Sequence, residues 1–482
     1  MAWARDPNAP NILWIKAAPG AGKSTIASSL VQVLAINHLR LGSDYFFHRQ
    51  DTATTTRSLW RKVAYDFARH PTIRKHLAAK LKKGQIDLTT PNTGGLFHHL
   101  IEEPLLRIGN IPGDQTPVII VDALDECGGL EGAHSEERQQ LMQTLGLWSK
   151  LPNCKMIVTS REDDDIARAF ELNPPYTIDL LVGEETAKQS TRDIQVFLGE
   201  ELGKIASKYS TPTVEWPGTS TIESLAIKAN GLFIWASTVV EYVRRGNPEK
   251  RLKQIANGER VTGMNALYTT VLCTAFPDAE SELLQEMRTI LATIIVAQET
   301  LGLQTLADLL AIDRWTVEHI CNALRPVLEI DGGVRFRHQS FVDFVLNSNT
   351  TYLTPCITTN DCHQILANQS LHVMKDKLRF NICGISSSYL LNSDILHALP
   401  STEAYIPSHL HYASRYWADH LHHAVASTEI MTLLRHVLKI QFLFWLEVAS
   451  LCGFVDDVPS ILFVLTVWLK VTIAISPHMF HI

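Results

Sequence analysis

The stretch AAPGAGKST at Ala17–Thr25 constrains the fold of this chain more than any other, because it requires a strand, a loop and a helix in succession. The apolar run Asn11–Lys16 before it predicts a buried strand, and Ser24–Leu34 after it predicts a helix. A loop between a strand end and a helix start presents unpaired backbone N–H groups and the positive end of the helix dipole. The sequence therefore predicts a phosphate-binding loop.

The residue types in this loop suit a bound nucleotide. We expect Lys23 to reach the β- and γ-phosphates and the Ser24 hydroxyl to hold Mg²⁺, while Gly20 and Gly22 let the backbone curl around the phosphates. The first glycine of the usual signature is Ala17 here, which is tolerable if its φ is negative. The alternative is a glycine-rich turn that happens to precede Lys-Ser, which the flanking strand and helix disfavour. The predicted nucleotide contacts are Pro19, Gly20, Ala21, Gly22, Lys23, Ser24 and Thr25.

A second motif, VIIVDALDEC, places three acids at and beyond the end of an apolar strand, Pro117–Asp122. Asp122 is expected at the carboxyl edge of the sheet, where it would hold Mg²⁺ through water opposite Ser24. Asp125 and Glu126 follow closely enough to face the same cleft, and Glu126 is the better candidate to orient an attacking water. The alternative is a pair of surface carboxylates in a loop.

Strands that alternate with helices predict an α/β P-loop NTPase domain with a parallel sheet and helices on both faces. Arg161 ends the fourth strand, where it is positioned to sense the γ-phosphate; the alternative is an exposed loop arginine. Because the sequence has no Asn/Thr-Lys-x-Asp stretch of the kind that reads guanine, ATP and ADP are the expected ligands. The remaining expected strands are Leu41–His48, Cys154–Glu162 and Tyr176–Leu181, and the expected helices are Thr55–Arg69 and Gly95–Arg107.

Composition limits the other classes of function. The length of 482 residues predicts two to four domains. The net charge of −7 gives no indication of nucleic-acid binding, which usually requires a basic surface. The eight cysteines lack CxxC spacing, and the N-terminus has no apolar signal core. We therefore expect reduced thiols and a cytoplasmic location.

The chain beyond residue 182 consists mainly of helix formers. Ile222–Arg245 is expected to be helical, and two short helices followed by a hairpin that contains Val334, Phe336 and His338 predict a winged-helix unit. The predicted domains are the nucleotide-binding domain 1–182, a helical domain 183–265, a winged-helix domain 266–350 and a C-terminal helical domain 351–482 with a hydrophobic tail.

These motifs give the chain a resemblance to fungal NACHT-type NTPases of the STAND class, which are related to NOD-like receptors. ILWIKAAPGAGKST, VIIVDALDEC and KMIVTSRE are general to P-loop ATPases, whereas NGLFIWAS, VRFRHQSFVDFVL and FLFWLEVASLCGFVDD in this order are specific to large fungal proteins. Such proteins usually carry an N-terminal effector domain and C-terminal WD-type repeats, neither of which is present here. The resemblance implies that His338 contacts the β-phosphate of ADP. Gly231-Leu232-Phe233 corresponds to the family's Gly-x-Pro, so the proline contact is not carried over.

The resemblance further implies an ATP/ADP switch with slow hydrolysis, acting in signalling or innate-immunity-like recognition such as heterokaryon incompatibility or programmed cell death. The expected partners are nucleotide, other copies of the chain, and effector or sensor proteins in trans. A membrane partner is not expected, because the apolar run Ile461–Ile475 is short for a span and contains Lys470, which favours a buried helix. The alternatives are a P-loop kinase for a small molecule and an interaction scaffold that does not cycle.

Overall fold

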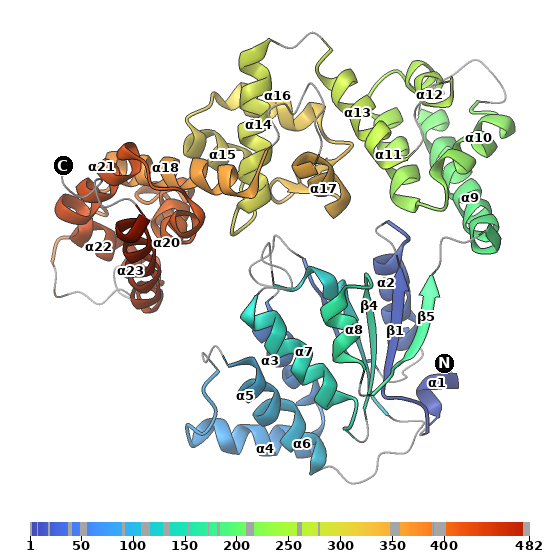
Figure 1. The fold of residues 1–482 in the computed structure, drawn as a ribbon, viewed down its shortest axis with the longest axis horizontal. Helices are drawn as coiled ribbons and strands as arrows, with labels where there is room; N and C mark the ends of the chain where they lie inside the picture. Colours follow the sequence, from blue (N-terminus) through green and yellow to red (C-terminus); the bar gives the residue numbers. More distant parts are fainter. Residues whose placement is uncertain are drawn as a thin grey trace. The chain divides into compact units, whose positions relative to one another are not determined.

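The computed structural model divides into two compact units, Met1–Leu267 and Tyr268–Ile482, and each is described by itself (Figure 1). The described residues are 2–6, 8–17, 20–36, 41–48, 55–88, 92–107, 116–128, 135–151, 154–171, 173–180, 184–208, 216–257, 263–277, 280–347, 357–387, 389 and 402–475.

A five-stranded parallel sheet forms the centre of the first unit, in the order β2-β3-β4-β1-β5. This confirms the predicted fold class, and each strand lies within two residues of its predicted bounds. β4 pairs with both β1 and β3, so it lies between the strand that leads into the glycine-rich loop and the strand that ends in Asp122. The strands are β1 Ile12–Ala17, β2 Leu41–Phe46, β3 Val118–Asp122, β4 Lys155–Ser160 and β5 Tyr176–Leu180.

The sheet has a separate hydrophobic core on each face, because successive side chains of a strand point to opposite faces. Leu13 and Ile15 pack on one face with residues of α1 and α2, whereas Ile12 and Trp14 pack on the other face with residues of α3 to α8. The helices are α1 Ala2–Arg5, α2 Lys23–Ile36, α3 Thr56–Phe67, α4 Pro71–Lys82, α5 Thr93–Phe97, α6 Glu103–Leu106, α7 Glu136–Trp148 and α8 Asp164–Ala169.

The helix predicted at Gly95–Arg107 is not one regular helix. It consists of α5, a π-helical turn η1 (His98–Glu102) and α6. Pro104 lies in the first turn of α6, and because proline has no N–H it cannot donate the regular α-helical hydrogen bond there. Proline therefore accounts for a break in the α-helical pattern that apolar periodicity did not reveal.

The helix predicted at Ile222–Arg245 is also wrong as a single element. It is divided into α10 (Thr219–Ala229) and α11 (Phe233–Arg244) by Asn230 and Gly231, whose φ angles are +47° and +78°. Asparagine and glycine tolerate this left-handed conformation and end helices, so the local capping signal overrides the apolar spacing. The first unit also contains α9 Glu184–Lys208 and α12 Pro248–Asn257, and α13 Met264–Ala275 spans the boundary between the units.

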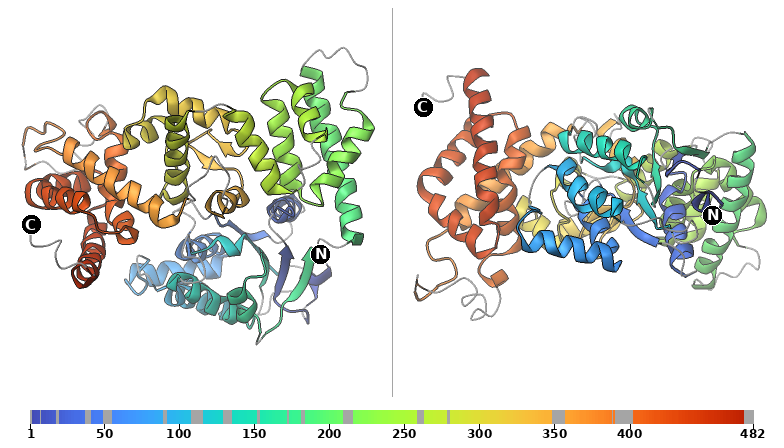
Figure 2. Two further views of the ribbon diagram at one scale, coloured as in Figure 1. Left: turned by 45° about the horizontal axis from the view of Figure 1, so that its top comes forward. Right: turned by 90° about the horizontal axis from the view of Figure 1, so that it is seen from below.

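The second unit is largely helical (Figure 2). Two helices precede a short antiparallel hairpin of β6 and β7, whose turn contains Gly332 and Gly333 with φ angles of +79° and +120°. The element order matches the sequence prediction, and the winged-helix assignment itself stays a prediction. The elements are α14 Ser281–Val296, α15 Leu303–Leu310, α16 Arg314–Ala323, β6 Leu328–Glu329, β7 Arg335–Phe336, α17 Gln339–Asn347, α18 Thr359–Lys377, α20 Ser408–His423, α21 Thr428–His436, α22 Phe442–Leu451 and α23 Val458–Ile475.

A buried hydrogen-bond chain joins α18 and α20. The backbone N–H of Gln298 donates to Tyr412 Oη over 3.1 Å, so the Tyr412 hydroxyl can donate in turn to His420 Nε2, 2.8 Å away. Neutral His420 then carries its proton on Nδ1 and donates to His363 Nδ1 at 3.0 Å. Burial lowers the pKa of His363 to about 4, so both rings are neutral at physiological pH.

The apolar C-terminal run forms α23, and the expectation of a buried helix holds for one face only. Ile461, Leu465 and Trp468 are buried, whereas the Phe463 side chain is 69% exposed. Among the described residues, Val455–Ala474 is the one segment long and apolar enough to cross a membrane, which is weak evidence that it does so.

Two glycine substitutions test the break between α10 and α11. Gly231→Ala should cost about 1 kcal/mol or more of stability, because alanine is strained at positive φ. Gly203→Ala, in the middle of α9 with no atom within 4 Å of the added Cβ, should instead stabilise by about 0.5–1 kcal/mol. Unfolding midpoints of the two variants measure the difference, and equal shifts in the same direction would contradict the left-handed break.

Candidate nucleotide site

The glycine-rich loop follows a strand and precedes a helix, as the sequence predicted. β1 ends at Ala17 and α2 begins at Lys23, and between them Gly20 and Gly22 have φ angles of +78° and +85°. Ala17 pairs with Leu180 in the sheet, so its backbone is extended and the alanine is accommodated without strain. Pro19, one of the predicted contacts, lies outside the described residues.

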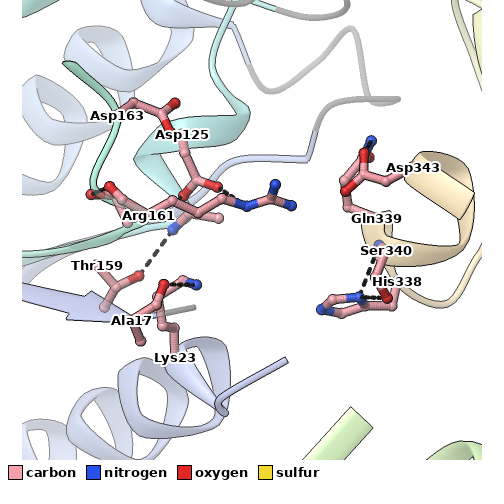
Figure 3. Close-up of polar contacts among 12 residues, drawn as sticks. Ala17, Lys23, Asp125, Thr159, Arg161, Asp163, His338, Gln339, Ser340 and Asp343 are labelled. Carbon is pink, nitrogen blue, oxygen red and sulfur yellow. Dashed lines mark hydrogen bonds and ion pairs between the residues drawn. The ribbon is translucent and has the colours of Figure 1, made fainter. Parts of the chain in front are cut away.

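Lys23 is the electrostatic centre of the site. Its Nζ donates to the Ala17 carbonyl oxygen over 2.9 Å (Figure 3). Burial lowers the pKa of Lys23, while the charges of Asp125, Asp122 and Glu126 raise it and that of Arg161 lowers it. The four other charged residues predicted for this site therefore all lie within electrostatic reach of the lysine. Ser24 and Thr25 are exposed in the first turn of α2, and Ala21 is half-buried before it.

Asp122 is buried at the end of β3 and is held by a residue that the sequence analysis missed. Thr159 in β4 donates from Oγ1 to Asp122 Oδ1 over 2.5 Å, and the same hydroxyl accepts from the backbone N–H of Ala123 at 3.1 Å. A threonine directly after the apolar run Met156–Val158 of β4 was the available signal. Its function became visible only when β4 was found beside β3.

The residue after Asp122 adopts an uncommon conformation. Ala123 has φ +53° and ψ +48°, a left-handed geometry that costs a non-glycine residue about 1–3 kcal/mol. It directs the chain into a single 3₁₀ turn, Leu124–Glu126, in which the Glu126 N–H donates to the Ala123 carbonyl oxygen over 2.8 Å. Strain of this kind at the end of a sheet is typical of a functional turn.

Asp125 and Arg161 engage each other. The Arg161 backbone N–H donates to Asp125 Oδ1, and its Nε pairs with Oδ2, both at 3.1 Å (Figure 3). Both oxygens of the buried Asp125 carboxylate are thus engaged by Arg161. The role of Glu126 in orienting water stays a prediction. The predicted approach of Arg161 to a γ-phosphate stays a prediction.

Arg138 supports this loop and was not predicted. It is 1% exposed, and its guanidinium donates to both oxygens of Asp165, at 2.7 and 2.9 Å, and to Asp163. Nη1 donates to the Asp125 carbonyl oxygen at 2.7 Å and to that of Cys127. The arginine therefore ties the acidic turn to the start of α8. A lone arginine in a helix gives no sequence signal for such a role.

The start of α11 packs against the loop. A Cβ built on Gly20 would lie 2.2 Å from Ile234 Cγ2 and 3.9 Å from Leu232 Cδ2. Glycine is therefore required at position 20 both for its positive φ and for this close approach. Gly231-Leu232-Phe233 thus leads into a helix that contacts the phosphate-binding loop.

His338 belongs to the second unit, so its predicted contact with nucleotide stays a prediction. Its Nδ1 accepts from the backbone N–H of Ser340 over 3.0 Å and lies 2.7 Å from the Ser340 hydroxyl (Figure 3). Because Nδ1 accepts, the neutral ring carries its proton on Nε2 and presents a donor there. That tautomer suits a phosphate oxygen.

The family model described as Nephrocystin 3, N-terminal, matches residues 1–161, which contain the loop and all three acids. Residues 1–161 of the 482 are therefore similar to that family. No curated protein matches the chain.

Two solved structures are distantly similar to this chain. One is a Signal Transduction ATPase with Numerous Domains (STAND) protein with a tetratricopeptide repeat sensor from Pyrococcus horikoshii, at 14% identity and a TM-score of 0.37 over 97% of this chain; this chain spans 62% of that protein's length. The other is the Walker-type ATPase of Pyrococcus abyssi, at 14% identity and a TM-score of 0.31, over 70% of this chain and 91% of that one.

Substitution of Lys23 tests the predicted nucleotide site. Lys23→Ala should abolish nucleotide binding, because it removes the charge that faces the phosphates. Titration with a fluorescent ATP analogue measures the loss. Lys253→Ala removes an exposed lysine of α12 that pairs with Glu249 and should bind as the wild type does. Wild-type affinity in Lys23→Ala would refute the site.

Proposed function

We propose that this protein is a regulatory switch that binds ATP and ADP and hydrolyses ATP slowly. Its support is the similarity of residues 1–161 to the Nephrocystin 3, N-terminal, family model, together with one observation, the electrostatic grouping of Lys23 with Asp122, Asp125, Glu126 and Arg161. A cation among three carboxylates and an arginine, beside a glycine-rich helix start, suits a nucleoside triphosphate and its metal ion.

Ser24 and Asp122 are the residues that would hold Mg²⁺. A hydroxyl and a carboxylate are the oxygen ligands that this ion prefers, and Asp122 is fixed by its hydrogen bond from Thr159. The ion would neutralise charge on the phosphates. The chain's own residues would position the reacting groups, with Lys23 on the β- and γ-phosphates and Glu126 on the attacking water.

The switch requires two states with different affinities for ATP and ADP. The phosphate-binding residues lie in the first compact unit and His338 lies in the second. In our proposal, His338 donates from Nε2 to the β-phosphate of ADP in a closed state, and loss of this bond favours an open state that self-associates. The proposed setting is cytoplasmic signalling or innate-immunity-like recognition, with effector or sensor proteins in trans.

The acidic turn provides a test of the hydrolytic step. Glu126→Gln should retain ATP binding and slow hydrolysis by about 10²-fold or more, because the amide keeps the shape but loses the charge that orients water. Asp125→Asn should mainly lower the melting temperature, because it weakens the pair with Arg161. Phosphate release without any added acceptor measures hydrolysis, and a requirement for a small-molecule acceptor would indicate a kinase instead.

The assignment of roles within the turn would be wrong if Asp125→Asn slowed hydrolysis while Glu126→Gln did not. Melting curves recorded with saturating ATP separate an effect on chemistry from an effect on folding.

Substitution of His338 tests the switch. His338→Ala should weaken ADP binding by roughly ten- to a hundredfold, leave ATP binding nearly unchanged and increase self-association, since a charge-assisted hydrogen bond contributes about 1.5–3 kcal/mol. Calorimetric titration with each nucleotide and light scattering measure these effects. His319→Ala, an exposed histidine of the same unit, is the matched control.

If His338→Ala weakened ATP binding and ADP binding equally, His338 would no longer support the proposed switch. A lower melting temperature with intact ADP affinity would instead assign His338 a structural role.

A further inference from the structure

A cluster of histidine and glutamate side chains lies where the π-helical turn η1 meets α6. The helices α4, α5 and α6 lie together at one end of the first unit (Figure 1). His98, His99 and Glu103 each offer one ligand atom, and these atoms lie within 4.8 Å of one another. We propose that this cluster binds Zn²⁺. Two imidazole nitrogens and a carboxylate oxygen are ligands that zinc takes, with water as a fourth ligand.

His98 has a carboxylate partner of the kind that metal-binding histidines use. Its Nδ1 lies 2.7 Å from Glu102 Oε2, and because a carboxylate only accepts, Nδ1 carries the proton. The neutral ring therefore presents the Nε2 lone pair. Histidines that bind metal commonly donate their other ring N–H to a carboxylate in this way, so Glu102 is the positioning residue of the site.

His99 has a buried nitrogen that no described residue satisfies. Its Nδ1 makes no hydrogen bond and lies 3.8 Å from Glu103 Oε2. His76 Nε2, from α4, is equally without a hydrogen bond and lies 3.7 Å from the other oxygen of Glu103. Buried polar atoms without partners are uncommon and costly, and a metal ion on His99 would remove one such cost.

The π-helical turn brings the ligands together. The rings of the consecutive residues His98 and His99 have centroids only 4.9 Å apart, and Glu103 follows at the first position of α6. Single π-helical turns within helices are frequent at functional sites.

Two basic residues set the expected strength of the site. Lys80 pairs with Glu103 Oε2, and Arg107 pairs with Oε1 at 3.2 Å. They hold the carboxylate in place, but they also repel a further cation, so the ion shares Glu103 with Lys80. Binding should therefore be reversible and removable by chelators. Mg²⁺ and Ca²⁺, which prefer sites made wholly of oxygen, should not compete.

The test uses the full chain without a histidine tag, stripped of metal by a chelator and titrated with Zn²⁺ by calorimetry. The wild type should bind one ion at this site, and His98→Ala and His99→Ala should lose it. Glu102→Gln should bind roughly ten- to a hundredfold more weakly, as expected when a carboxylate behind a metal-binding histidine is altered. His70→Ala, an exposed histidine immediately before α4, should bind as the wild type does.

Absence of zinc binding in the wild type, or unchanged binding in both His98→Ala and His99→Ala, would overturn the proposal. The His98 side chain is 56% exposed, so its variant should fold even if His99→Ala does not, and circular dichroism without metal checks this. Titration with Co²⁺ adds a spectroscopic readout, because the absorption of four-coordinate cobalt should appear in the wild type and be lost in His98→Ala.

Discussion

Parallel pairing of β4 with both β1 and β3 is the constraint on which the nucleotide site depends. The pairing brings three parts of the chain to one edge of the sheet, although they are far apart in the sequence. They are the end of β1, which leads into the glycine-rich loop, and the residues Thr159 and Asp122. Thr159 then bonds both the Asp122 carboxylate and the N–H of Ala123, so one hydroxyl fixes the acid and the strained residue after it. The carboxyl edge of a parallel sheet is the general location of ligand sites because strand ends and helix starts converge there.

A second, buried network holds the acidic turn in shape. Arg138 donates to two carboxylates and two backbone carbonyls, and Asp125 accepts twice from Arg161. A buried charge costs several kcal/mol to desolvate unless its donors and acceptors are satisfied, and this network satisfies them. Rigidity of this kind is what the proposed hydrolytic site would need in order to keep Glu126 and Asp122 in place. The zinc proposal concerns a different and less satisfied cluster, in which two histidine nitrogens have no hydrogen bond.

Local signals predicted much of the first unit and fewer details elsewhere. All five strands were predicted because buried parallel strands form short apolar runs bounded by polar residues. Helix continuity was predicted less well. Apolar spacing suggested one helix across Asn230 and Gly231 and another across Pro104. The first helix is ended by the left-handed cap at Asn230, and the second is interrupted near Pro104, which has no backbone N–H. Periodicity reports which face is buried, but it does not report where the backbone hydrogen bonds stop.

The sequence by itself determined the phosphate-binding loop, the acids of the VIIVDALDEC motif and the parallel sheet, because each depends on residue types at short spacing. Only the tertiary structure decided how Asp125 is held, since its carboxylate acquires its partner Arg161 from the residue after β4 and its carbonyl oxygen accepts from Arg138 on α7. It also decided that Thr159 and Ile234 belong to the site's surroundings. These roles arise from contacts between residues distant in sequence, and such contacts exist only after strand order and helix packing have been set.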